Sequence, residues 1–132
     1  MPFVVDDHIE ELWIDVNPGI TGSIPTNVDK ITTINSLSMS ELSLTGTLPT
    51  EMGLLTGMLQ MWLFGNGLTG TIPTEYGSLQ YLTLLQLHDN ALTGTMPTQV
   101  CDNVAGSKFG SIAVLTSDCL SEMDCTCCST CY

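Results

Sequence analysis

The sequence predicts a solenoid of the α/β type, in which short parallel β-strands stack and return through 3-10 or irregular segments. One observation is a repeat that starts at residues 20, 44, 68 and 92, where ITGSIPT, LTGTLPT, LTGTIPT and LTGTMPT occur in register. A repeat this short cannot bury its own apolar face, so its copies must stack and share one core. The other observation is that all six cysteines follow residue 100, which predicts a stapled C-terminal cap. We therefore divide the chain into an irregular N-terminal coil and edge (1–19), regular repeats (20–100) and a disulfide-rich cap (101–132).

The apolar positions of one repeat show where its strand lies. In the third copy they are Leu68, Ile72, Tyr76, Leu79, Leu82, Leu85 and Leu87. The last two alternate with a period of two, which is typical of a strand with one buried face. The same slots are apolar in the preceding copies, so we expect ladders of side chains stacked at the strand spacing of about 4.8 Å.

Turn residues follow each predicted strand. Asn66 and Asn90 come three residues after it, where a buried side-chain amide can satisfy the backbone groups of the turn. Leu42 occupies this slot one copy earlier, so the asparagine ladder is interrupted. The Gly of each TG dipeptide suits a turn with positive φ, and the Pro that follows fixes φ on the return side.

Both ends of the repeat array are irregular. Upstream, Ile9, Leu12 and Ile14 predict one more strand, and an inserted Pro18-Gly19 pair shifts its register by one residue. Downstream, residues 112–115 predict a closing strand. The N-terminal end has no cysteine cap, so we expect that preceding sequence, another chain or residues 1–8 cover its exposed strand edge.

The cysteines favour disulfides over a metal site. They are Cys101, Cys119, Cys125, Cys127, Cys128 and Cys131. An even number at one end indicates a stapled cap in an oxidising compartment, so we expect an extracellular or cell-surface protein. The rival hypothesis is a thiolate metal site, because C-x-C-C-x-x-C resembles metal-ligand spacing. Six cysteines allow 15 pairings, and the sequence does not choose among them.

The charge balance excludes several kinds of partner. Fourteen Asp and Glu residues face only Lys30 and Lys108, so the formal net charge is −12. Nucleic acids and anionic membrane surfaces need Lys and Arg, so we expect neither as a partner. No apolar run approaches the roughly 18 residues of a membrane span, and we expect no membrane-spanning segment.

Catalysis is poorly supported, and we expect no enzyme, cofactor or metal. His8 and His88 are far apart in the register, and no Ser or Cys is placed for a triad. The carboxylates are scattered along the coils, so none is paired for acid and base roles. No phosphate loop or dinucleotide fingerprint occurs.

The pattern L-x-x-L-x-x-L-x-L-x-x-N-x-L-T-G-x-I-P resembles the leucine-rich repeat family, in its plant-type subclass of 24 residues. The resemblance covers roughly residues 9–100, or about four strands, and implies a curved, right-handed solenoid. The motif T-G-T-I-P-T-E and the cysteine-rich C-terminal segment most resemble those of secreted or surface leucine-rich repeat proteins of diatoms and related algae. In this family the side chains between the strand leucines face outward on the concave sheet. Those positions are Glu11, Trp13, Asp15, Ser36, Ser38, Ser40, Gln60, Trp62, Phe64, Leu84, Gln86 and His88.

The outward aromatic residues are the candidate binding site. Trp62 and Phe64 are candidate anchors, because exposed aromatic residues are enriched in interfaces, and Trp13 is a weaker candidate. Gln60, Gln86 and His88 complete the predicted partner-binding set. The structural alternative is that these aromatic residues only cover the sheet or pack against the cap.

Three functions follow as hypotheses. The first is a non-enzymatic extracellular recognition or adhesion module that binds a protein or a glycan through the concave face. The second is a structural subunit of a larger or self-assembled complex, docking through the uncapped N-terminal edge. The third is ice binding through ladders of hydroxyl residues stacked at strand spacing. The ladder residues are Thr21, Ser23, Thr26, Thr45, Thr47, Thr50, Thr69, Thr71, Thr74, Thr93, Thr95 and Thr98.

Overall fold

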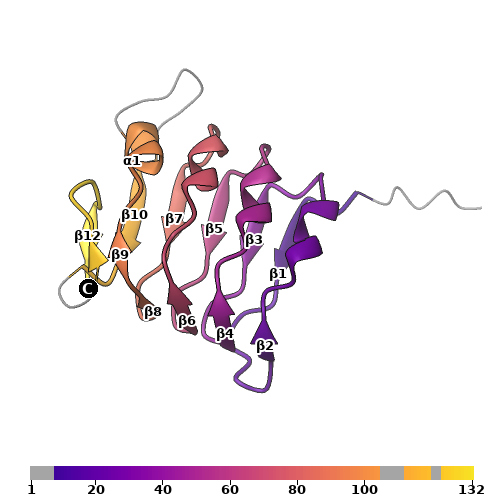
Figure 1. Cartoon of the computed structure of the whole chain (residues 1–132). Coiled ribbons are helices and arrows are strands. Elements are labelled where there is room, and N and C mark those ends of the chain that lie inside the picture. The colour runs from indigo at the N-terminus through magenta and orange to yellow at the C-terminus, as the bar shows by residue number, and fades with distance from the viewer. Residues whose placement is uncertain (1–7, 105–111, 120–122) are drawn as a thin grey trace, which may run out of the picture.

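The computed structural model describes residues 8–104, 112–119 and 123–132, and it shows a solenoid whose coils stack side by side (Figure 1). One strand from each coil joins a parallel six-stranded sheet of order β1-β3-β5-β7-β10-β12. These strands are β1 (Glu11–Trp13), β3 (Ser36–Ser38), β5 (Gln60–Trp62), β7 (Leu84–Gln86), β10 (Val114–Ser117) and β12 (Thr130–Cys131). The predicted solenoid is confirmed: its sheet contains the four expected strands and the predicted closing strand β10, and β12 of the cap adds a sixth.

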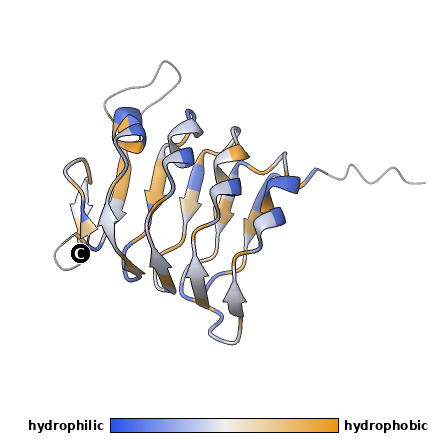
Figure 2. Ribbon diagram, in the orientation of Figure 1, coloured by the Kyte–Doolittle hydropathy of each residue, from blue (hydrophilic) through white to orange (hydrophobic). Residues whose placement is uncertain are grey.

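A second parallel sheet runs along the coils and has the order β2-β4-β6-β8. Its strands are β2 (Thr21–Ser23), β4 (Ser43–Thr47), β6 (Gly67–Gly70) and β8 (Ala91–Leu92). Near-neutral colouring in Figure 2 reflects the Thr, Ser and Gly content of β2, β4 and β6. A short pair, β9 (Gly94–Thr95) with β11 (Met123–Asp124), ties this side of the last coil to the cap.

Short helices complete the coils. Three 3-10 helices, η1 (Thr26–Lys30), η2 (Thr50–Leu54) and η3 (Thr74–Ser78), each follow an extended proline that leads into the turn. The α-helix α1 (Thr98–Val104) takes this place in the last coil. Among the described residues, no helix has the length and apolar composition needed to cross a membrane.

The apolar ladders form one continuous core. In the central coils the ladder residues are almost fully buried, including Met61, Leu63, Leu85 and Leu87 at 0% exposure. Tyr76 is also fully buried, and its hydroxyl donates to the carbonyl oxygen of Pro49 at 3.2 Å. The polar atom that this side chain brings into the ladder is thus satisfied by the neighbouring coil.

The asparagine prediction is confirmed in atomic detail. Asn66 Oδ1 accepts from the Leu44 amide at 3.1 Å, and its Nδ2 donates to the carbonyl oxygens of Met39 and Leu63. Asn90 makes the same contacts one coil later, starting with the Leu68 amide. Each side chain therefore joins two coils.

The first coil explains why Leu42 can replace asparagine. An asparagine there would accept from the amide of Ile20, by analogy with the next two coils. That amide instead donates to the Asn17 carbonyl oxygen at 2.9 Å, within the turn that contains the inserted Pro18-Gly19 pair. Because the donor already has a partner, the slot can hold Leu42, which is only 6% exposed.

The cysteine-rich cap is confirmed as a disulfide cluster. The pairs are Cys101–Cys127, Cys119–Cys131 and Cys125–Cys128. All six cysteines are paired, so none is left as a thiolate ligand. The predicted closing strand is β10, whose Leu115 is fully buried against the core.

Within the second sheet the threonine residues do not stack as expected, and this part of the ice-binding hypothesis needs correction. In the six-stranded sheet, Ser36 pairs with Gln60 at an offset equal to the repeat. In the second sheet, Thr47 pairs with Thr69 and Thr45 with Gly67, two residues short of it. Threonines at equivalent positions are therefore shifted along the strands, and no unbroken file of hydroxyl residues runs across this sheet.

The outer face of the six-stranded sheet carries the side chains that alternate with the buried leucines of its strands. We call it the concave face, because the resemblance to leucine-rich repeat proteins implies that this sheet lines the inside of the curve.

Candidate functional site

The concave face presents side chains that alternate with the buried leucines of each strand. Cross-strand pairing places Trp13 beside Ser38, Ser38 beside Trp62, and Trp62 beside Gln86. Residues two positions further along each strand form a neighbouring row that includes Phe64 and His88. The repeat register predicted from the sequence therefore matches the observed strand pairing of β3, β5 and β7. The contacts and the burial of each side chain are seen only in the structure.

Trp13 and Trp62 meet although β3 separates their strands. Their ring centroids are 4.9 Å apart with the planes tilted by 39°, above the small side chain of Ser38. Trp13 remains 53% exposed, and its Nε1–H donates to Glu11 Oε2 at 3.2 Å. The pair forms an aromatic surface that is open to solvent on the Trp13 side.

Three serines, two in β3 and one two residues beyond it, lie underneath neighbouring side chains, in contrast to the expectation that they face solvent. Ser36, Ser38 and Ser40 are only 6%, 2% and 5% exposed. Serine is too small to project past its neighbours on β1 and β5, so the larger side chains close over it. These serines therefore form the floor on which the larger side chains of the concave face pack.

Asp15 anchors the serines from the first coil. Its Oδ1 accepts from Ser38 Oγ and, at 2.9 Å each, from the amide and Oγ of Ser40. Burial alone would raise the pKa of Asp15, but the hydrogen bonds from Ser38 and Ser40 outweigh it and lower the pKa below the ordinary 3.8. Asp15 therefore remains a carboxylate at neutral pH.

A second aromatic cluster lies towards the cap. His88 is sandwiched between Phe64, with centroids 4.8 Å apart, and Tyr132, with centroids 4.1 Å apart. His88 Nδ1 shares a hydrogen bond of 2.7 Å with Thr116 Oγ1. At 8% exposure His88 supports its neighbours, whereas the expectation was an outward contact residue. Gln60 and Gln86 are half-buried and lie beside the two clusters.

Tyr132 is a residue of this surface that the sequence reasoning missed. It is 50% exposed, and its amide donates to the Ser117 carbonyl oxygen at 3.0 Å. The preceding Cys131 is held by the disulfide to Cys119. Tyr132 lies outside the repeats, so only its aromatic character could have signalled a role.

Carboxylates border the aromatic surface along the edge where the concave strands turn. Glu41 and Asp89 occupy the turn with φ of 53° and 54° and are exposed. Asp118 accepts from the amides of Asp89 and Asn90 at 2.7 and 2.9 Å. Together with Asp15, these groups make the edge negatively charged. Among the described residues, Lys30 is the one Lys or Arg, and it lies on η1, outside this face.

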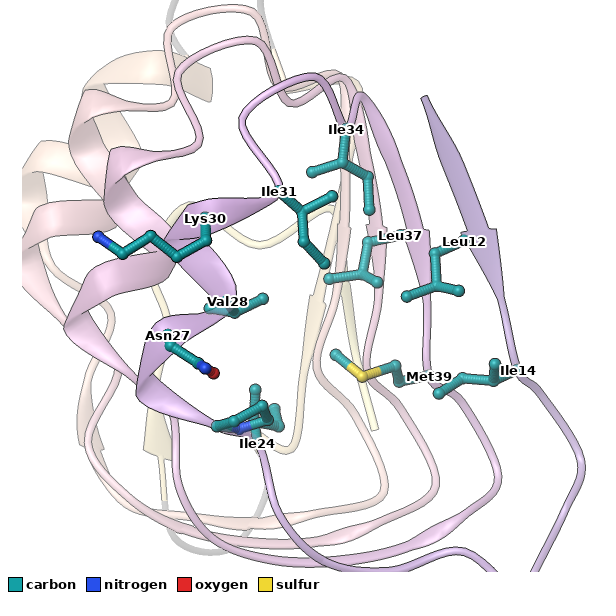
Figure 3. Close-up of a pocket in the computed structure, with 11 residues that line it drawn as sticks. Leu12, Ile14, Ile24, Asn27, Val28, Lys30, Ile31, Ile34, Leu37 and Met39 are labelled. Atoms are coloured by element: carbon teal, nitrogen blue, oxygen red, sulfur yellow. The ribbon is translucent and has the colours of Figure 1, made fainter. Parts of the chain in front are cut away.

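A hollow lies at the N-terminal end of the core formed by the described residues. A cavity of about 410 Å³ lies between β1, β3 and η1 and is lined mainly by aliphatic side chains (Figure 3). Leu12, Ile31 and Leu37 point into it, whereas Lys30 points away. It lies at the edge of the stack for which the sequence predicts a covering segment or chain.

The fold is shared with solved plant proteins. In the BIR3–SERK2 complex from Arabidopsis thaliana, the matching chain is 26% identical with a TM-score of 0.71, over 86% of this chain and 56% of that one. The plant peptide hormone receptor RGFR1, solved with RGF2, is 34% identical with a TM-score of 0.67, over 70% of this chain and 15% of that one. A plant ice-binding protein is 28% identical with a TM-score of 0.71, over 89% of this chain and 35% of that one.

These similarities cover only part of each solved chain. This chain spans little more than half of the first structure and much less of the other two. No family model and no curated protein matches the sequence. All three structures are plant proteins, so the narrower similarity to diatom and algal proteins stays a prediction.

Proposed function

Because this chain belongs to the leucine-rich repeat family, we propose that it is a non-enzymatic binding module that recognises a protein or glycan partner through its concave face. The observation that carries the proposal is the paired aromatic surface of Trp13 and Trp62 above Ser38. Solved proteins of the same fold include the plant peptide hormone receptor RGFR1 in complex with RGF2. Binding of RGF2 is a property of RGFR1, and it supports a binding role for this chain.

The exposure of the aromatic residues supports a contact role. Trp13 and Tyr132 are about half exposed, and such residues are the usual anchors of interfaces. Six strands at about 4.8 Å give a face about 29 Å wide, and strands of three or four residues make it about 10–13 Å deep. This is roughly 300–400 Å², against about 800 Å² per partner in a standard interface. The face alone suits a short peptide or a small glycan.

The cap supports a location outside the cell. Three disulfides concentrated in residues 101–131 suit an oxidising compartment, because reducing compartments keep thiols unpaired. We place the protein in the extracellular space or at the cell surface.

The test is partner capture from native extracellular material with purified, oxidised protein. A variant with Trp62→Ala and Phe64→Ala should lose the captured partner while its melting temperature stays close to that of the wild type. The matched control is Leu54→Ala with Leu59→Ala, which removes two exposed apolar side chains elsewhere. Equal capture by wild type and the concave-face variant would refute the proposal.

A second candidate function, docking into a larger assembly, is favoured by the cavity at the N-terminal end of the described coils. The 410 Å³ apolar cavity and the outer edge of β1 would both be covered by a neighbouring chain. Sedimentation or size-exclusion measurements should then show self-association that Ile31→Asp abolishes. A stable monomer at micromolar concentration would count against self-assembly.

Ice binding is a third candidate, and the similarity to a plant ice-binding protein favours it. Thr45, Thr47 and Thr69 are exposed on the second sheet, but their shifted pairing breaks the expected files. Thermal hysteresis that disappears in Thr47→Lys would support this function. Hysteresis equal to that of a buffer control would remove it.

A further inference from the structure

We propose that the ligand of the concave face is a cationic, extended peptide segment, with a Lys or Arg side chain placed against the Trp13–Trp62 pair. This inference rests on the proposed function and specifies its ligand. It combines two features of the same surface. The first is the solvent-exposed aromatic rings, and the second is a border of carboxylates whose charge no Lys or Arg on the described strands of this sheet compensates.

The formal charges of Asp, Glu, Lys and Arg on the described concave face all have one sign. Glu11, Asp15, Glu41, Asp89 and Asp118 lie on this face or on the turns at its edge. No strand of the six-stranded sheet carries Lys or Arg. The whole chain has a formal net charge of −12, so the long-range field also attracts cations. A positively charged segment is therefore the complementary partner.

The aromatic pair supplies the matching short-range contact. A Lys or Arg cation is attracted to the face of an indole ring, and this contact strengthens when a carboxylate lies nearby. Trp13 is 53% exposed, and the hydrogen bond to Glu11 at 3.2 Å holds its indole beside a carboxylate. The ring and the charge can thus act on the same cation.

The dimensions favour an extended peptide. A face about 29 Å wide can be crossed by about nine residues at roughly 3.3 Å per residue. The pair Trp13–Trp62 lies at one end of the face, and the carboxylates of Asp89 and Asp118 lie towards the other. Cationic residues at both ends of the peptide would meet both groups.

A synthetic peptide of about this length, with Arg at both ends and Gly and Ser between, tests the proposal by calorimetry. The matched probe has Gln in place of each Arg. We expect binding of the Arg peptide alone, and weakening as salt shortens the screening length from about 10 Å at 0.1 M to about 3 Å at 1 M.

One single variant and two double variants distinguish a specific site from general electrostatic attraction. Trp62→Ala should weaken binding of the Arg peptide about tenfold, and Glu41→Gln with Asp89→Asn about fivefold. Glu51→Gln with Glu75→Gln removes the same charge from the 3-10 helices and should leave affinity nearly unchanged. Equal losses in both charge pairs would show non-specific attraction and overturn the proposal.

The outcome also distinguishes this inference from the proposed function. If the Arg peptide does not bind but capture of a native partner still requires Trp62, the face binds another class of ligand and only this inference fails. Salt-independent binding of a neutral oligosaccharide that requires Trp62 would likewise overturn this inference alone. If neither the peptide nor any native partner depends on Trp62, both proposals fail.

Discussion

Trp13 and Trp62 lie on strands separated by β3, and their ring centroids are nevertheless only 4.9 Å apart. Two strands with one strand between them are about 9.6 Å apart, so the rings must lean towards each other. They can do so because the residue between them is Ser38, whose side chain is 2% exposed and accommodates the rings above it. The candidate binding surface therefore depends on a small residue as much as on the aromatic ones.

The first prediction concerns this pair. Trp62→Ala should expose the remaining indole of Trp13, because its partner ring is removed. Acrylamide quenching of the Trp13 fluorescence should increase and its emission should shift to longer wavelength. Phe64→Ala, in the other cluster, is the control and should leave Trp13 unchanged. Unchanged quenching in Trp62→Ala would mean that the two rings do not pair in solution.

The second prediction concerns Asp15 and pH. Its carboxylate accepts hydrogen bonds from Ser38 and Ser40, and its pKa is lowered in the folded state. The unfolded state therefore binds the proton more tightly, and the stabilisation is present above pH 3.8 and is lost as the pH falls through the folded-state pKa. At pH 7, Asp15→Ala should cost about 2 kcal/mol of unfolding free energy, as expected for hydrogen bonds to a charged group.

Thermal unfolding at several pH values checks this. The difference in stability between wild type and Asp15→Ala should be constant near neutral pH and should shrink below pH 3.8. A difference that does not change with pH would indicate that Asp15 acts through packing alone.

The third prediction uses the interrupted asparagine ladder. Asn66→Leu should cost about 2–3 kcal/mol, because the Leu44 amide and the Met39 carbonyl oxygen lose their partner in the core. The reverse change, Leu42→Asn, should bring no stabilisation, because the Ile20 amide already donates to Asn17. Chemical denaturation of both variants measures the contrast. A stabilising Leu42→Asn would show that the first coil lacks a hydrogen bond.

The fourth prediction concerns the contact between η2 and η3. A Cβ added at Gly53 would lie 2.6 Å from the carbonyl oxygen of Glu75, which is backbone and has little room to move. Gly53→Ala should therefore destabilise the protein by about 2 kcal/mol through overpacking. Gly57 has nothing within 4 Å of such a Cβ, so Gly57→Ala should leave stability unchanged or raise it slightly. Equal melting temperatures for the two variants would contradict this difference.

The sequence predicts the structure most completely where the repeat itself carries the information. The strands, the buried ladders and the roles of Asn66 and Asn90 follow from spacing, because each coil must place equivalent atoms against its neighbours. Outside the repeat the sequence predicts least. Tyr132 belongs to the concave surface only because the disulfide Cys119–Cys131 and a bond to Ser117 hold the cap against β10.

The sequence by itself determined the solenoid, its shared core, the outward positions of the concave strands and the stapled cap, because a short repeat can bury its apolar residues only by stacking. Tertiary structure alone decided how those outward residues combine. The pairing of Trp13 with Trp62, the burial of His88 and the shifted pairing of Thr47 with Thr69 depend on side-chain size across strands and on the register between strands of neighbouring coils. Neither quantity is encoded in the spacing of one repeat, because both arise from contacts between coils.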